Sequence, residues 1–186
     1  MSDTWFIADT HFNHKKLLDF RDKEGNAIRD FSSVEAMNEH IIECWNSVVK
    51  PNDTVWHLGD VVSGDDRMLW MYTNFQRLNG IKKLIIGNHD QLPDICLYFD
   101  EARLWMIDTD LRILLSHVPI HQSCAHMFGS KDSGILKDPL PLLNVHGHIH
   151  EHPSPPGPYQ CVSVEQINYT PINVDQLKID LLQKTG

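Results

Sequence analysis

The stretch Lys-Leu-Ile-Ile-Gly-Asn-His-Asp, residues 83–90, is the strongest indication of fold in the chain. Its first four residues form an aliphatic-rich run that is typical of a short buried strand. The run ends at Gly87, and three side chains that can bind metals or transfer protons follow: Asn88, His89 and Asp90. Open α/β folds hold their sites at the carboxyl ends of strands, so the stretch predicts a strand leading into a site. Taken alone, a Gly-Asn turn with a solvated histidine explains it equally well.

Two earlier strands are expected to end in the same way. Residues 5–8 lead into Asp9 and His11, and residues 54–58 lead into Asp60. Alternate residues at an extended strand end face the same way, so Asp9 and His11 can share one ion. Three successive strands that end in Asp, His or Asn are hard to obtain by chance, and they favour one shared site.

Helices are expected between these strands. Ser32 and Glu35 have the spacing of a capping box, and apolar residues at three- and four-residue steps continue the helix as far as residues 51–53, Pro-Asn-Asp. A second helix is expected from Arg67 to Leu78. The resulting order of strand, helix, strand, helix, strand predicts an α/β fold.

The second half of the chain is more mixed. Residues 102–107 and 111–115 have the pattern of a hairpin, and the second run leads to His117. The remaining expected elements are an irregular loop over 118–143, a strand over 142–145, an exposed proline-rich loop over 153–158, strands over 161–164 and 172–174, and a helix over 175–183.

Composition narrows the class of protein. With 186 residues and 41% hydrophobic content, the chain suits a single domain, residues 1–186. Its net charge of −9 disfavours binding to nucleic-acid backbones. Four widely spaced cysteines form no C-x-x-C pair and are expected to be reduced thiols in a cytoplasmic protein. No signal peptide or run of transmembrane length is visible, so no membrane association is expected.

Five short blocks follow one another along the chain: Asp9-x-His11, Gly59-Asp60, Gly87-Asn88-His89-Asp90, His117 and Gly147-His148-x-His150. In this pattern the chain resembles the calcineurin-like metallophosphoesterase superfamily, whose blocks read D-x-H, G-D, G-N-H-[D/E], H and G-H-x-H. The match extends from Asp9 to His150, and every block is intact. The resemblance implies a four-layer α/β/β/α sandwich.

The resemblance also implies a dinuclear metal centre. By similarity, Asp9, His11, Asp60 and His150 hold one ion, while Asn88, His117 and His148 complete the second and Asp60 bridges. The mixed ligands suit borderline divalent ions, of which we expect Mn²⁺, with Fe, Zn or Ni as alternatives. A metal-bridged hydroxide would attack phosphorus, His89 would protonate the leaving oxygen, and Asp90 would orient the imidazole of His89.

The expected function is hydrolysis of phosphate mono- or diesters of small or flexible substrates, such as nucleotides or cyclic nucleotides. A nuclease or nucleic-acid end-processing enzyme is an alternative that the acidic charge disfavours. A protein phosphatase is a second alternative, weakened because Gln91-Leu92-Pro93 follows Asp90 where that branch adds arginines. A non-catalytic scaffold is a third, and it is disfavoured because every ligand and the proton donor are present. The oligomeric state is left open.

Other residues have two interpretations each. His14 and Arg29 are candidate substrate contacts. The alternatives are that His14 is an exposed loop histidine and that Arg29 forms a surface salt bridge. Solvated or rim positions are favoured over metal ligation for a further group: His121, Cys124, His126, Glu151 and His152. His57 is expected to form hydrogen bonds at the edge of the core, and Trp45 and Trp56 to lie within it.

Overall fold

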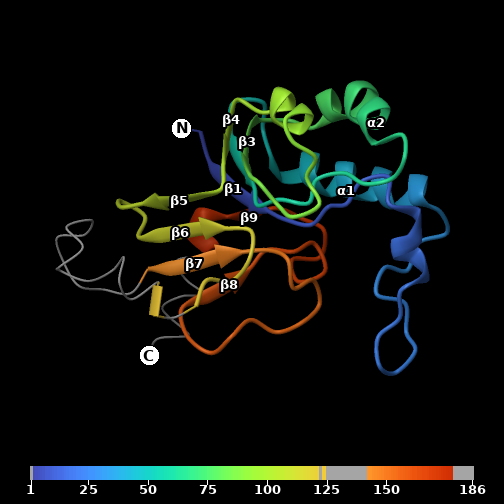
Figure 1. The fold of residues 1–186 in the computed structure, drawn as a ribbon. Coiled ribbons are helices and arrows are strands. Elements are labelled where there is room, and N and C mark those ends of the chain that lie inside the picture. Colours follow the sequence, from blue (N-terminus) through green and yellow to red (C-terminus); the bar gives the residue numbers. More distant parts are fainter. Residues whose placement is uncertain (1, 122, 125–141, 178–186) are drawn as a thin grey trace.

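The first of two sheets carries the strands expected from the N-terminal half. The computed structural model describes residues 2–121, 123–124 and 142–177 (Figure 1). Four parallel strands and one antiparallel edge strand pair in the order β4-β3-β2-β1-β9. Their bounds are β1 Thr4–Ile7, β2 Thr54–His57, β3 Ile81–Ile85, β4 Glu101–Arg103 and β9 Ile172–Asn173. Parallel pairing brings the carboxyl ends of β1, β2 and β3 to one edge.

Helices connect these strands, with small differences from expectation. They are η1 Lys15–Asp19, α1 Val34–Val48, α2 Arg67–Asn74, η2 Phe75–Arg77 and η3 Asp94–Tyr98, where η marks a 3-10 helix. The cap of α1 is Ser33 and not Ser32, because the Ser33 hydroxyl accepts the Ala36 N–H at 3.1 Å. The second helix is shorter than expected, since its last turn tightens into η2.

The second sheet has the order β5-β6-β7-β8. Its strands are β5 Trp105–Asp108, β6 Ile113–Ser116, β7 Leu143–His146 and β8 Tyr159–Cys161. The hairpin is confirmed, because β5 and β6 pair antiparallel. The single strand expected over 102–107 is wrong: the chain changes sheet at Leu104, which is 69% exposed. Both halves have strand-forming sequences, and periodicity alone cannot identify the partner of each half.

Late elements are partly as expected. The strand expected over 161–164 lies earlier, at β8, because residues 162–164 leave that sheet and contact the end of β1, where Ala8 N–H donates to Val162 O at 2.8 Å. Residues 153–158 form no helix or strand, as predicted. The terminal helix begins within the described residues, at 174–177, and the rest of the expected 175–183 lies outside them. Most of the expected 118–143 loop also lies outside the described residues.

The two faces of the first sheet pack against different partners. Ile7, on one face of β1, belongs to a core cluster with Met37 and Trp45 of α1. The adjacent Phe6 points to the opposite face and packs with Leu115 and Val145 of the second sheet. The helices and the second sheet thus pack on opposite faces of the first sheet; in Figure 1 α1 and α2 lie at the upper right and β5–β8 to their lower left.

This packing confirms a mixed α/β fold with two sheets and helices on one of them. The described residues do not test the outer, fourth layer of the expected sandwich, which stays a prediction. Trp45 and Trp56 lie in the core as predicted. All four cysteines are free, and within the described parts of the chain no helix is long and apolar enough to cross a membrane.

Candidate metal centre

The predicted ligands lie in the segments that directly follow five of the strands, and most have unusual backbone conformations. Positive φ angles occur at Asp9 (55°), His11 (43°), Asp60 (59°), His148 (71°) and His150 (50°). Such angles are unfavourable for residues with a Cβ atom and persist only where the surroundings impose them. The backbone is therefore held in conformations that aim these side chains at one place.

Close approach of the loops explains the glycines in the motifs. A Cβ atom on Gly59 (φ +93°) would lie 2.6 Å from the Cα atom of Gly87 and 2.6 Å from Nδ1 of His117. Any side chain at Gly59 would therefore push apart the loops that carry the second, third and fourth motifs.

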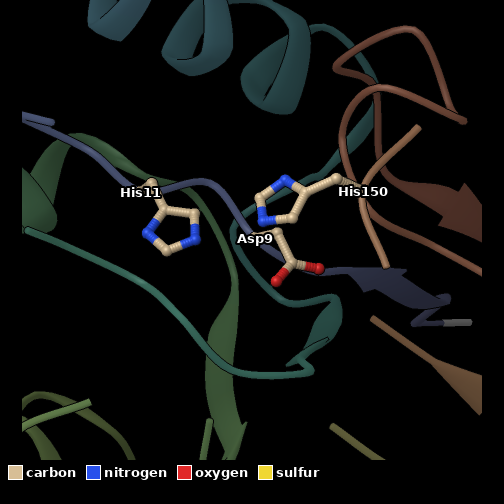
Figure 2. Close-up of side chains that lie close together, drawn as sticks. All are labelled: Asp9, His11 and His150. Carbon is tan, nitrogen blue, oxygen red and sulfur yellow. The ribbon is translucent and has the colours of Figure 1, made fainter. Parts of the chain in front are cut away.

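Asp9, His11 and His150 form the first group of ligand atoms, all within 4.8 Å of one another (Figure 2). The carboxylate of Asp9 is fully buried, and its Oδ2 accepts the Ser163 hydroxyl at 2.7 Å and the His148 N–H at 2.8 Å. Its Oδ1 has no hydrogen-bond partner in the described structure. Burial raises the pKa of Asp9 to about 6. A buried carboxylate oxygen without a partner is costly, and a cation beside it would remove that cost.

Asp9 also belongs to a second group, with Asp60 and His117. Oδ2 of Asp60 lies 3.5 Å from Nε2 of His11 and 3.5 Å from Nε2 of His117. The carboxylate of Asp60 is therefore placed between the two groups.

The surroundings of His117, like those of Asp9, favour a bound positive charge. Its Nδ1–H donates to the Leu58 carbonyl at 2.7 Å, while its Nε2 faces Oδ1 of Asn88 at 2.8 Å as well as Asp60. A neutral imidazole that donates through Nδ1 directs a lone pair at those oxygens. Either a proton or a metal ion on Nε2 would relieve this arrangement. The donor set of carboxylates and imidazoles thus fits divalent metal ions.

The pKa shifts of two side chains, His11 and Asp60, favour the protonation states that bind metal ions. Burial lowers the pKa of His11 to about 2, so its imidazole is neutral and offers a lone pair. Burial alone would raise the pKa of Asp60, but hydrogen bonds and charge from His117, with the His89 N–H, outweigh it and lower that pKa to about 2. Asp60 is therefore an anion at neutral pH.

Three residues that sequence reasoning missed support the first group. Ser63 Oγ lies 3.1 Å from Nδ1 of His11, Ser163 binds Asp9, and Oε1 of Glu165 lies 2.9 Å from Nδ1 of His150. Partners of this kind fix the orientation of metal-binding side chains. No sequence motif includes them: Ser63 lies three positions after Asp60, and Ser163 and Glu165 lie beyond the last block.

Arg29 is neither a substrate contact nor part of a surface salt bridge, and both expectations are corrected. The residue is only 1% exposed. Its guanidinium donates to the carbonyls of Thr10 at 2.8 Å and Asp9 at 2.6 Å, and to Glu165 Oε1 at 2.8 Å. A guanidinium with five N–H donors can bind three partners at once, and here it joins the end of β1 to Glu165.

Asp90 is also placed differently from expectation. Its Oδ1 accepts the Val61 N–H at 2.9 Å, and its Oδ2 accepts the N–H groups of Gly87 at 2.8 Å and Asp60 at 3.0 Å. Both oxygens therefore join the second and third motifs, and neither bonds the ring of His89. The His89 N–H donates to Oδ1 of Asp60 at 2.8 Å, and its exposed ring lies 5.5 Å from the ring of His11.

The remaining candidates lie around this centre. Asn88 and His148 are exposed, and the His148 ring lies 5.1 Å from the ring of His117. His14 is half-buried, with its ring 5.5 Å from that of His11.

The exposure of the remaining described residues agrees with the solvated, rim or core-edge positions that the sequence favours for them. His121, Cys124, Glu151 and His152 are exposed, and His126 lies outside the described residues. His57 is buried and lies 2.9 Å from the Thr10 hydroxyl, as expected of a hydrogen-bonding core residue.

Comparison with known proteins gives three kinds of match. The family model for calcineurin-like phosphoesterases matches residues 3–108. An uncharacterized protein from Methanocaldococcus jannaschii is 30% identical over 99% of this chain and 93% of its own length. The Gene 66 protein of Mycobacterium phage L5 is 39% identical over 48% of this chain and 41% of its own. A crystal structure of a protein of unknown function from Aquifex aeolicus superposes with a TM-score of 0.68, at 26% identity, over 98% of this chain and 100% of that one.

Proposed function

The chain belongs to the calcineurin-like phosphoesterase family of metal-dependent hydrolases, and we propose that it hydrolyses phosphate mono- or diesters of small or flexible substrates with two bound divalent ions. Nucleotides and cyclic nucleotides are the substrates we expect first, and Mn²⁺ the ion. The observation that carries the proposal is the position of Asp60 Oδ2, 3.5 Å from both His11 and His117.

The proposed ligands divide between two ion positions. The first would be held by Asp9, His11, Asp60 and His150, and the second would be completed by Asn88, His117 and His148. The two groups of ligand atoms that contain Asp9 support this division. Because Asp9 belongs to both groups, its carboxylate is a second candidate, beside that of Asp60, for bridging the two ions. When bound, the ions supply positive charge that polarises the phosphoryl group and lowers the pKa of water.

The protein's own groups would contribute positioning and proton transfer. His89 is the proposed proton donor to the leaving oxygen, supported by its exposure beside the first group and by its backbone N–H bond to Asp60. Asp90 is a positioning residue, because its carboxylate ties the loop of His89 to the loop of Asp60. His14 remains a candidate phosphate contact, supported by its half-buried ring 5.5 Å from the ring of His11.

Hydrolysis of bis-p-nitrophenyl phosphate by the Mn²⁺-loaded protein tests this proposal. We expect His89→Ala to lower kcat by about a hundredfold or more, the usual range for a general acid, while the metal content stays near two ions per chain. His121→Ala is the matched control, since it removes an exposed histidine that belongs to neither ligand group. Undiminished turnover by His89→Ala would overturn its role.

A substrate screen separates the alternatives. Rates on a phosphate monoester, a diester, a cyclic nucleotide, an oligonucleotide and a phosphopeptide would be compared with the same metal-loaded preparation. Preference for the oligonucleotide would favour the nuclease, and preference for the phosphopeptide would favour the protein phosphatase. A metal-replete protein that is inert to all five would favour the scaffold.

A further inference from the structure

A cavity of about 410 Å³ opens beside the metal centre. One wall is formed by the last motif and the residue after it: His148, His150 and Glu151. Leu17, Phe20 and Ile28 form an apolar part of the wall, and the lining as a whole is mostly apolar. Cavities of this size hold small organic ligands. Because His148 and His150 line it, a molecule inside would lie next to a phosphate at the metal centre.

The apolar wall is separate from the hydrophobic core. Leu17, Phe20 and Ile28 belong to none of the core clusters formed by the described residues. Phe20 is 50% exposed although it is a large aromatic residue. Leu17 is already buried at 6% exposure, so the uncovered part of the wall is Phe20 together with the half-buried Ile28, and a ligand in the cavity would cover it.

The segment that carries this wall is well braced. Residues 20–28 form a tight hairpin in which the Ile28 N–H donates to the Phe20 carbonyl at 3.1 Å, and Asp22 accepts the Asn26 N–H at 2.8 Å. Arg21 donates to the Phe20 carbonyl at 2.9 Å. Figure 1 shows the hairpin as the blue segment that extends below α1.

The hairpin is also tied to the metal centre. Arg29 follows it directly and is bonded to the carbonyls of Thr10 and Asp9 and to Glu165. The apolar wall therefore has a defined position relative to Asp9 and His150. Because this wall is already ordered, binding a substrate against it does not carry the entropic cost of ordering the segment first.

Charge determines which part of a substrate enters the cavity. Glu151 and the buried Glu165 line it, and the described lining contains no lysine or arginine. The charge of Glu165 is balanced by Arg29 and His150. The described lining therefore offers a phosphate no lysine or arginine, whereas cations at the metal centre would attract it. The cavity therefore suits the uncharged organic group of a phosphate ester.

We propose that this cavity binds an aromatic ring of the substrate, with Phe20 stacking on it, so that the enzyme favours phosphate esters that carry a ring close to the phosphate. This inference rests on the proposed function only in taking the phosphate to lie at the metal centre. A flat ring next to Phe20 would cover its exposed face, and offset or edge-to-face contacts between rings add to the gain from burial.

Binding of two phosphonates to the Mn²⁺-loaded protein tests the proposal without requiring turnover. Benzylphosphonate and methylphosphonate share the charged head group and differ by the ring. Calorimetry should give a dissociation constant about tenfold lower for benzylphosphonate, and Phe20→Ala should bring the ratio close to one. Phe20→Trp should retain the preference. Leu97→Ala, which removes another exposed apolar side chain far along the chain, should also retain it.

The ratio is independent of how much of each preparation is folded, so it remains meaningful if a variant is less stable. Equal affinity of the wild type for both phosphonates, or a preference that persists in Phe20→Ala, would overturn the proposal. Failure of both phosphonates to bind a protein that hydrolyses esters would overturn it too. A ring preference in a protein that hydrolyses nothing would support the cavity and refute the proposed function.

Discussion

The two proposed ion positions differ in how firmly the chain supports their ligands. In the first position Asp9 and His11 are buried, and each ligand other than the shared Asp60 has its own partner: Ser163 for Asp9, Ser63 for His11 and Glu165 for His150. In the second position Asn88 and His148 are exposed, and among these ligands only His117 is buried. Buried, oriented ligands lose less freedom when they bind, so the first position should hold its ion more tightly.

Removal of the shared ligand should have the largest effect. Asp60→Ala deletes the carboxylate between His11 and His117, and we expect both ions to bind more weakly and kcat/KM to fall by at least about a hundredfold. Metal content by elemental analysis and turnover by the p-nitrophenyl assay measure the two effects. Asp66→Ala, at an exposed aspartate, is the control. Full retention of both ions would show that Asp60 is not a bridge.

Loss of support for the first position should have an intermediate effect. Glu165→Gln removes the charge that faces His150 and Arg29, and ion affinity at the first position should fall by about 10- to 100-fold. Glu39→Gln is a matched control, because Glu39 also pairs with an arginine, Arg77, but at the surface. If Mn²⁺ titration detects no difference between the two variants, the partner residues do not explain the contrast between the positions.

Loss of one exposed ligand should have the smallest effect. Asn88→Ala removes one neutral oxygen, so affinity at the second position should fall by about tenfold while the first ion is retained. A metal titration should then show one tight and one weak site, and Asn52→Ala, at an exposed asparagine, should behave like the wild type. Loss of the tight site in Asn88→Ala would reverse the proposed order of affinities.

Local patterns predicted the strand ends and the order of motifs well. A strand followed by Asp, His or Asn is visible in a few residues, and parallel pairing then brings such ends together without further information. The family resemblance supplied the second sheet, which periodicity alone could not place. The sequence does not predict the split of residues 102–107 at Leu104, because both halves have the same strand-forming character.

Long-range contacts could not be predicted in this way. Arg29 and Glu165 are separated by 136 positions, and nothing near either residue indicates the other. The resemblance implies the imidazole of His89 as the partner of Asp90, whereas the Asp90 carboxylate bonds the backbone of a loop about 30 positions earlier. Only the folded loops reveal this partner.

The contacts of Asp9 would link ion binding to completion of folding. Asp9 follows β1 of the first sheet, but its carboxylate accepts the N–H of His148, which follows β7 of the second sheet. A chain in which the sheets have not docked therefore lacks a complete first position. An ion present at 100 times its dissociation constant would stabilise the docked state by about 2.7 kcal/mol. Metal supply would then act on the amount of folded protein in a cell as well as on its activity.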